Sequence, residues 1–519
     1  MMPVATQVFR LDDLLSRLPV FCLWLAFALI PILFSQFSKY TKHTVLPNLP
    51  VAGRKFSFEP LLLTRYRFVL RGWEITRDAW HKYKDTGFTI VRPDSNSTVL
   101  PQRYVDELQN LHDDKLHPIE ALSHDMQGKY TGMTILEGSH LSFNVIRNKL
   151  TPRLGSLVPV LADEVDYALN TEIPPCKDQW VGLDLNTIMT RIISRLTSRT
   201  WVGLDLCRNE DWHETNLNTT QQIFFTALIL KCLPAVLHPI LGPVLPTKLR
   251  LNRGLKRIHS YLTPVIEDRR RKEAVLEGYE KPEDVLQWMM DAAEGEERDA
   301  ENLATRYVFS IIGSLYTVSA GLVDCLYDLI ARPEYMHELR TELTDALRED
   351  GGWAKGTASK LVKMDSFMKE SQRVNAPSPI SFKRMVKEPI TLSDGLVLPK
   401  DTYICVVNTS SIGREEEPFD GYRYTRKRDQ GNAGVALPRN QYSSTDKDHI
   451  TFGHGRFACP GRFVASVEIK LVLAAMLERY DLAFDQEGQS STRPPNLHVL
   501  ELGFQDPRVK VYVREREGR

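Results

Sequence analysis

The feature that most constrains this chain is the segment FGHGRFACPGR at residues 452–462, in which a cysteine follows a glycine-rich stretch. Two glycines before the sulfur allow tight backbone turns, and the Pro-Gly pair after it leads into a run at residues 463–480 that predicts a helix. The N-terminus of a helix and nearby backbone N–H donors favour a thiolate over a thiol. The segment therefore indicates a thiolate at Cys459.

The other six cysteines have no comparable context. They form no CxxC pair and no disulfide-like spacing, which is typical of a protein in a reducing compartment. A buried free cysteine behaves as a small hydrophobic residue, so we expect a structural role for each. They are Cys22, Cys176, Cys207, Cys232, Cys325 and Cys405. The same interpretation, a buried cysteine in a glycine-rich turn, would be preferred for Cys459 if its segment stood alone.

The cysteine segment resembles the signature of the cytochrome P450 family, Phe-Gly-x-Gly-x-(basic)-x-Cys-x-Gly. Phe452, the second glycine, Cys459 and the glycine after it stand at the family's spacing. The basic position is occupied by Phe457, and Arg456 stands one residue early. The resemblance implies that Cys459 is the axial ligand of the iron of haem b, where a thiolate promotes O–O cleavage. It also implies that Phe452 and Arg456 contact the haem.

Two further motifs keep the family's order. Glu370 and Arg373 match Glu-x-x-Arg, and their i, i+3 spacing puts both side chains on one helix face. A solvated salt bridge explains most such pairs when they stand alone. The segment PFDGYR, ending at Arg423, resembles the motif that gives the same glutamate a second arginine. The resemblance implies that Glu370, Arg373 and Arg423 form a buried cluster that locks the cysteine loop beneath the haem.

A candidate for oxygen activation lies in the segment GSLYT at residues 313–317. It resembles the family's (Ala/Gly)-Gly-x-(Asp/Glu)-Thr, in which a threonine hydroxyl relays protons, so the resemblance assigns that role to Thr317. The alternative is a helix threonine bonded back to its own backbone. Tyr316 stands at the acidic position, so we expect proton delivery to rely on water or on another group.

Two arginines are candidates to pair with the haem propionates. Arg147 follows the pattern Trp-x-x-x-Arg with Phe143 in place of the tryptophan, and its alternative is an exposed helix arginine. Arg384 stands seven residues after Pro377, where the family often places a second partner, and its alternative is a solvated charge on a strand.

The substrate can be predicted only as a class. The resemblance places the pocket around residues 130–135, Leu315 and residues 378–380, and the apolar stretch 224–241 is either a buried core helix or part of an access channel that dips into a bilayer. Segments such as HDDKLHP at residues 112–118 resemble those of fungal monooxygenases of secondary metabolism, a group that includes ent-kaurene oxidase. This favours a lipophilic terpenoid or meroterpenoid, with an indole alkaloid or a polyketide as alternatives.

The N-terminus predicts a membrane anchor. Residues 18–37 hold an uncharged apolar core and are long enough to cross about 30 Å as a helix. A cleaved signal peptide is the alternative, but no small-x-small cleavage site follows. Lys39 and Lys42 favour the cytosol for what comes after. The predicted division is a lumenal N-terminus at 1–17, the anchor at 18–37, a basic and proline-containing connector at 38–53 and a monooxygenase domain at 54–519.

The sequence after the connector predicts a mainly helical body with small β-sheets, as in the cytochrome P450 fold that the resemblance implies. Apolar residues recur at helical spacing from Ala304 to Leu347, with an interruption near Pro333. Short strands are predicted at residues 88–91, 390–392, 403–407 and 509–513. Lys+Arg and Asp+Glu are both 66, so a nucleic-acid partner is not expected.

The resemblance implies a monooxygenase in the endoplasmic reticulum membrane with a cytosolic catalytic domain. It would use O2 and electrons from NADPH through NADPH-cytochrome P450 reductase, with cytochrome b5 as an optional second donor. The alternatives are a haem-thiolate isomerase or peroxygenase, which needs no reductase, and a haem sensor without turnover. A cytosolic body would leave the sequons at Asn96, Asn218 and Asn408 unglycosylated.

Overall fold

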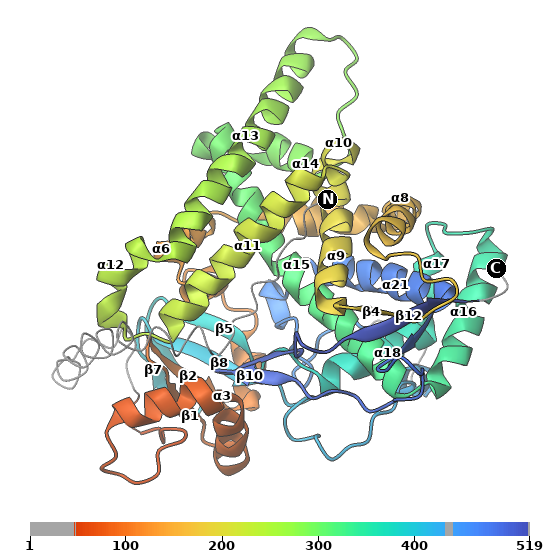
Figure 1. Cartoon of the computed structure of the whole chain (residues 1–519). Coiled ribbons are helices and arrows are strands. Elements are labelled where there is room, and N and C mark those ends of the chain that lie inside the picture. The colour runs from red at the N-terminus through yellow and green to blue at the C-terminus, as the bar shows by residue number, and fades with distance from the viewer. Residues whose placement is uncertain (1–45, 47, 431–439, 517–519) are drawn as a thin grey trace, which may run out of the picture.

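The computed structural model describes residue 46 and residues 48–430 and 440–516. The predicted anchor at 18–37 lies outside these residues. As predicted, the described body is mainly helical with small sheets (Figure 1). The α-helices are α3 Leu61–Tyr83, α4 Val105–Leu108, α5 Pro118–Asp125, α6 Gly128–Thr131, α7 Leu141–Val145, α8 Thr151–Glu172, α9 Leu185–Val202, α10 Leu204–Cys207, α11 Glu210–Lys231, α12 His238–Leu241, α13 Pro246–Val275, α14 Val285–Ala292, α15 Ala300–Ala331, α16 Glu334–Asp350, α17 Thr357–Lys360, α18 Val362–Val374, α19 Arg423–Asp429 and α21 Arg462–Arg479.

The strands form four small sheets. They are β1 Phe88–Val91, β2 Asn96–Leu100, β3 Leu116–His117, β4 Val181–Leu183, β5 Ile380–Val386, β6 Ile390–Thr391, β7 Val397–Leu398, β8 Tyr403–Val407, β9 Tyr480–Ala483, β10 Leu497–Val499, β11 Leu502–Phe504 and β12 Val511–Glu515. The largest sheet has the order β1-β2-β8-β5-β3, and its β2–β8 pair is parallel. The others are β4-β12-β9, β10-β11 and β6-β7.

The long predicted helix is α15, which runs through the centre of the helical part (Figure 1). The side chain of Asp299 caps its N-terminus by accepting a hydrogen bond from the N–H of Asn302. The helix ends at Ala331, just before Pro333, as the sequence predicts. It is long and apolar enough to cross a membrane, but more than half of its apolar window is buried against other elements. It is therefore the core helix of the body.

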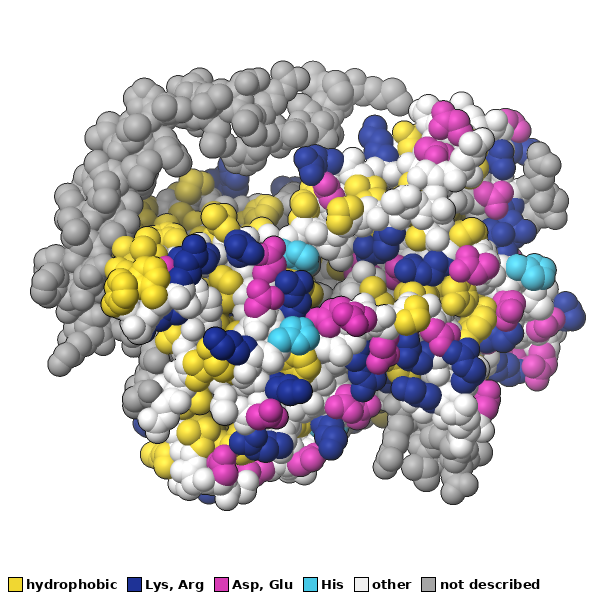
Figure 2. All heavy atoms as spheres, turned by 90° about the horizontal axis from the view of Figure 1, so that it is seen from below, with side chains coloured by type: hydrophobic (Ala, Val, Ile, Leu, Met, Phe, Trp, Pro, Cys, Tyr) yellow, Lys and Arg dark blue, Asp and Glu magenta, His cyan; other side chains and the backbone are white. Residues whose placement is uncertain are grey.

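The main core packs α15 against several other helices. Buried side chains of α8, α9, α18 and α21 join those of α15 in one hydrophobic cluster. The face seen in Figure 2 carries Lys and Arg side chains interspersed with Asp and Glu. This mixture agrees with the balanced charge of the sequence. α21, which begins three residues after Cys459, is thereby fixed directly against the core.

Candidate active site

The backbone conformation of the cysteine loop depends on two glycines. Gly453 and Gly455 have φ of +68° and +74°, a conformation that glycine adopts without strain. A Cβ at Gly455 would lie 2.5 Å from the backbone oxygen of Gln109, so the loop also needs a glycine there for close packing. The N–H of Cys459 donates to the carbonyl of Phe452 at 2.8 Å, which closes the loop. The predicted turn and the helix after it are both present.

The sulfur of Cys459 faces opposing electrostatic influences. Burial of the thiol among protein atoms raises its pKa, while the backbone N–H groups of Gly461 and Arg462 and the charge of Arg462 lower it. The guanidinium of Arg462 donates to the carbonyl oxygen of Cys459 at 2.7 Å, which holds its charge near the sulfur. A bound metal cation would be the largest local charge and would displace the thiol proton.

Cys459 and Thr317 line the same cavity, whose volume is about 380 Å³. Both side chains are exposed to it, from the cysteine loop and from α15. Gly313 and Gly321 also line it, and a Cβ at Gly313 would meet no atom within 4 Å. Phe452 completes the side of the cysteine loop. A cavity of this size with a thiol on one wall and small residues on the other fits the haem that the resemblance implies.

Thr317 and Tyr316 point to different neighbours. The hydroxyl of Thr317 donates to the carbonyl of Gly313 on its own helix, which is the backbone contact expected as its alternative. The side chain is nonetheless exposed to the cavity. The hydroxyl of Tyr316 donates to the carbonyl of Leu217 at 3.0 Å, and burial raises the pKa of Tyr316 to about 12. Tyr316 therefore cannot replace the missing acid.

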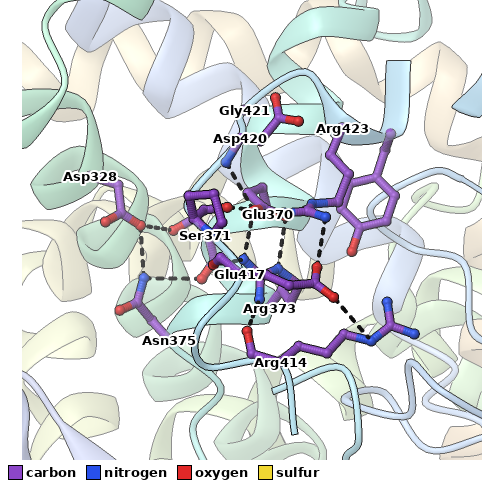
Figure 3. Close-up of polar contacts among 12 residues, drawn as sticks. Asp328, Glu370, Ser371, Arg373, Asn375, Arg414, Glu417, Asp420, Gly421 and Arg423 are labelled. Carbon is purple, nitrogen blue, oxygen red and sulfur yellow. Dashed lines mark hydrogen bonds and ion pairs between the residues drawn. The ribbon is translucent and has the colours of Figure 1, made fainter. Parts of the chain in front are cut away.

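Glu370, Arg373 and Arg423 are joined by hydrogen bonds in the buried core (Figure 3). Arg373 donates to both oxygens of Glu370, at 3.0 and 2.8 Å, and Arg423 donates to one at 3.0 Å. The N–H of Asp420 donates to the other at 3.0 Å. Burial opposes the charge of Arg373, but hydrogen bonding and attraction to Glu370 raise its pKa. The carboxylate thus has a partner on every side.

The same helix reaches the cysteine loop through polar contacts. Gln372, which lies between Glu370 and Arg373 on α18, is hydrogen-bonded to the ring of His449 at 2.8 Å. Two residues further on, the hydroxyl of Thr451 accepts a hydrogen bond of 2.9 Å from Asn408. The first contact joins the helix that carries the charged cluster to His449, three residues before Phe452, and the second joins Thr451 to Asn408, just after β8. The locking role expected of the cluster stays a prediction.

The predicted propionate partners have different surroundings. Arg384 is only 5% exposed, so the solvated alternative is wrong for it. Burial lowers its pKa to about 10, and its Nη2 has no hydrogen-bond partner among the described residues. Arg147 and Arg456 are exposed. The structure does not bring these three arginines to the cavity wall. Arg462, which sequence reasoning missed, contacts Cys459 directly.

Phe143 and Phe457, the two residues that depart from the family's tryptophan and basic positions, contact each other. The rings of Phe143 and Phe457 lie 6.1 Å apart, and the ring of His140 stacks on Phe457 at 6.1 Å. His140 is bonded in turn to the carboxylate of Asp113 at 2.6 Å. An aromatic cluster therefore occupies the place where the family pattern has a tryptophan and a basic residue.

A second cavity of about 500 Å³ lies beside the predicted substrate loop. Tyr130 and Thr134 line it from that loop, and His238 and Pro239 line it from α12. The first cavity contains Pro377, which precedes the other predicted pocket segment. The second cavity is thus bordered by the predicted segment 130–135, whereas none of the predicted pocket residues lines the first cavity.

Comparisons with known proteins identify the family of the chain. The profile of the family described as Cytochrome P450 matches residues 115–512. The chain is 37% identical to cytochrome P450 monooxygenase AN1598 of Emericella nidulans over 476 residues, which are 90% of this chain and 88% of that protein. It is 35% identical to ent-kaurene oxidase of Fusarium fujikuroi over 483 residues, 91% of this chain and 89% of that protein. The chain therefore belongs to the cytochrome P450 family and is a cytochrome P450 monooxygenase.

Proposed function

We propose that this monooxygenase oxidises a lipophilic intermediate of secondary metabolism, a terpenoid or meroterpenoid. The observation that supports it best is the common cavity of Cys459 and Thr317, which joins a haem ligand and a proton carrier at one surface. We assign Cys459 as the axial ligand, Phe452 and Arg456 as haem contacts, and Arg147 and Arg384 as propionate partners. Haem b would supply the activation of O2, with electrons from NADPH through the reductase.

The chain's own residues have separate tasks in this scheme. Thr317 holds a proton at the cavity wall, and its hydrogen bond to Gly313 fixes the hydroxyl in one orientation. Glu370, Arg373 and Arg423 position the cysteine loop from below. Gly313 leaves space on α15 in which a planar group and a substrate can lie, because a Cβ there would meet no atom within 4 Å.

Two observations support the proposed substrate class: the exposed apolar side chains of the 224–241 stretch and the name of one relative. Apolar side chains of the 224–241 stretch are exposed, with Val236 at 50% and Ile240 at 69%. These exposures favour contact with a membrane, from which a lipophilic substrate would enter. One relative is named as an ent-kaurene oxidase, which acts on a terpenoid skeleton.

The substrate is tested by deleting the gene and profiling metabolites. The accumulating precursor should be a terpenoid or meroterpenoid, and microsomes holding the protein and a reductase should convert it with NADPH-dependent oxygen uptake. If an indole alkaloid or a polyketide accumulates instead, the proposed substrate class is wrong and that compound is the substrate. Conversion without NADPH, or driven by peroxide alone, would support the isomerase or peroxygenase alternative.

Replacing Thr317 by alanine should uncouple the enzyme. The variant removes one hydroxyl from the cavity wall, so it should fold, take up haem and consume NADPH at a near-normal rate. Product per NADPH should fall about tenfold or more, because proton transfer contributes 10²- to 10⁴-fold to such steps. The measurement is the ratio of peroxide to product. Thr305→Ala, on the same helix and also bonded to its own backbone, is the control that should stay coupled.

We further propose that residues 18–37 anchor the protein in the endoplasmic reticulum membrane, with 1–17 lumenal, 38–53 as connector and 54–519 in the cytosol. Glycosidase treatment should then leave the gel mobility unchanged. The fold sharpens this test, since Asn96 and Asn408 are buried and Asn218 on α11 is exposed. A mobility shift that Asn218→Gln removes would show the opposite orientation.

A further inference from the structure

One ring nitrogen of His140 is buried and has no hydrogen-bond partner. His140 lies directly before α7, and its Nε2 is bonded to the carboxylate of Asp113 at 2.6 Å. The other nitrogen, Nδ1, makes no hydrogen bond among the described residues, although protein atoms shield it from solvent. A buried polar atom without a partner costs free energy, so folded proteins rarely keep one. Nδ1 of His140 is therefore a candidate contact for a group that the chain itself does not supply.

The ring of His140 is fixed by aromatic and ionic contacts. It stacks on the ring of Phe457 with the centroids 6.1 Å apart and the planes inclined by 27°, and it meets the ring of Phe143 edge-on at 6.4 Å. Partial burial opposes ionisation of Asp113, but the hydrogen bond from His140 lowers the pKa of this carboxyl below its ordinary value. Asp113 is therefore ionised at neutral pH. As an imidazolium, His140 can donate to Asp113 from Nε2 and to a second carboxylate from Nδ1.

His140 stands where two polar groups of the family pattern are missing. The pattern has a basic residue at the position of Phe457, two residues before Cys459, and a tryptophan at the position of Phe143. A phenylalanine ring can neither donate a hydrogen bond nor carry a charge. Because His140 contacts both rings, it brings an imidazole to the place that these two donors would occupy.

A second buried donor without a partner belongs to the same edge of the large sheet. Nη2 of Arg384, on β5, has no hydrogen-bond partner in the part of the chain that the structure describes. β5 pairs with β3 at Met385 and Val386, and Asp113 comes three residues before β3. One unpaired donor thus stands on β5, and the other is bonded to the segment that leads into β3. The propionate carboxylates of haem b are acceptors of the kind that both donors lack.

We propose that His140 binds a haem propionate in place of the basic residue that the family pattern has at the position of Phe457. This inference rests on the proposed haem site at Cys459. Asp113 holds the imidazolium, the rings of Phe143 and Phe457 set its orientation, and the N–H at Nδ1 donates to the propionate. Such a charge-assisted hydrogen bond is stronger than one between neutral groups. His140 is thus a positioning residue for the haem.

The first test is the rate at which the ferric holoprotein loses haem to an excess of apomyoglobin. His140→Phe keeps an aromatic ring against Phe457 and removes both nitrogens. Haem loss should become about tenfold faster, because a hydrogen bond to a charged group contributes about that factor or more. An unchanged rate of haem loss would overturn the proposal.

The matched control is His112→Phe. His112 also contacts the carboxylate of Asp113, at 2.8 Å, but its side chain is 56% exposed. Its replacement should leave the rate of haem loss unchanged. If the two variants lose haem equally fast, the effect runs through Asp113 and the proposed contact of His140 is wrong.

A double variant tests whether the two positions are interchangeable. His140→Phe combined with Phe457→His moves the imidazole from the start of α7 to the basic position of the family pattern. This variant should retain haem nearly as well as the parent protein. If it loses haem as fast as His140→Phe alone, an imidazole at this place is not what retains the haem, and the proposal fails.

Resonance Raman spectroscopy separates a propionate contact from a general loosening of the protein. The propionate bending band of the ferric protein responds to hydrogen bonding of the carboxylate. It should move to lower frequency in His140→Phe and stay in place in His112→Phe. If His140→Phe loses haem faster without this shift, His140 supports the fold and does not bind the propionate.

The carbon-monoxide spectrum distinguishes failure of this inference from failure of the haem site itself. His140→Phe leaves Cys459 in place, so freshly prepared protein should keep the red-shifted Soret band of thiolate ligation. If the parent protein lacks that band, the assignment of Cys459 is wrong and this inference falls with it. If the band is present and His140→Phe changes neither haem loss nor the Raman band, only the role of His140 is wrong.

Discussion

Replacing Cys459 by alanine should abolish the strongly red-shifted Soret band of the reduced, carbon-monoxide-bound protein. That band reports a thiolate on the iron, and Cys459 supplies the sulfur that faces the cavity shared with Thr317. The loop around it is fixed by the hydrogen bond to Phe452 and by two glycines with positive φ, and no other cysteine in the described part of the chain lines this cavity. The expected effect is complete loss of the band, measured by difference spectroscopy.

The control for this prediction is another cysteine. Cys405 is buried in β8 of the large sheet, and burial raises its pKa to about 12. Cys405→Ala removes one sulfur from the core without touching the cavity, so it should keep the full band. A red-shifted band of normal intensity in Cys459→Ala would contradict the assignment of the ligand, whatever the haem content.

The helices and strands could be predicted wherever one short signal decided them. Pro333 ends the long central helix, and the apolar run after Cys459 becomes α21 with a shift of one residue. The last strand begins at Val511, two residues later than predicted, because its position depends on pairing with β9 and β4. The local composition favoured β structure there. The exact start of the strand depends on its register with partner strands far away in the sequence, which local composition does not encode.

The positions of the candidate residues were predictable where a motif fixes both the residue and its spacing, and the roles of these residues stay predictions. Cys459 and Thr317 share a cavity, and the Glu370 cluster is bonded as the motif implied. Burial was not predictable, since Arg384 was weighed against a solvated charge and is buried. The partnership of Phe143 with Phe457 joins two departures that look unrelated in the sequence.

Replacing Glu370 by alanine should leave little haem-loaded protein. The change removes a fully buried carboxylate and strands the charges of Arg373 and Arg423 beside a cavity of a few atoms. Breaking a buried pair in this way costs about 3–5 kcal/mol, a large share of the roughly 5–15 kcal/mol that keeps a typical domain folded. The measurements are the yield of soluble protein, its haem content and its melting temperature.

Glu417→Ala is the matched control for this second prediction. Glu417 also bonds Arg423, at 2.7 Å, but its side chain is 40% exposed, so solvent screens the pair and its loss should cost about 0–1 kcal/mol. Haem content should stay near normal in that variant. The variants separate the structural role of Glu370 from the catalytic role of Thr317. Loss of Glu370 should prevent haem uptake, whereas loss of Thr317 should leave haem in place and raise only the ratio of peroxide to product. If Glu370→Ala folds and binds haem normally, the cluster does not hold the cysteine loop, and the contacts through Gln372 and His449 must be sufficient to position Cys459.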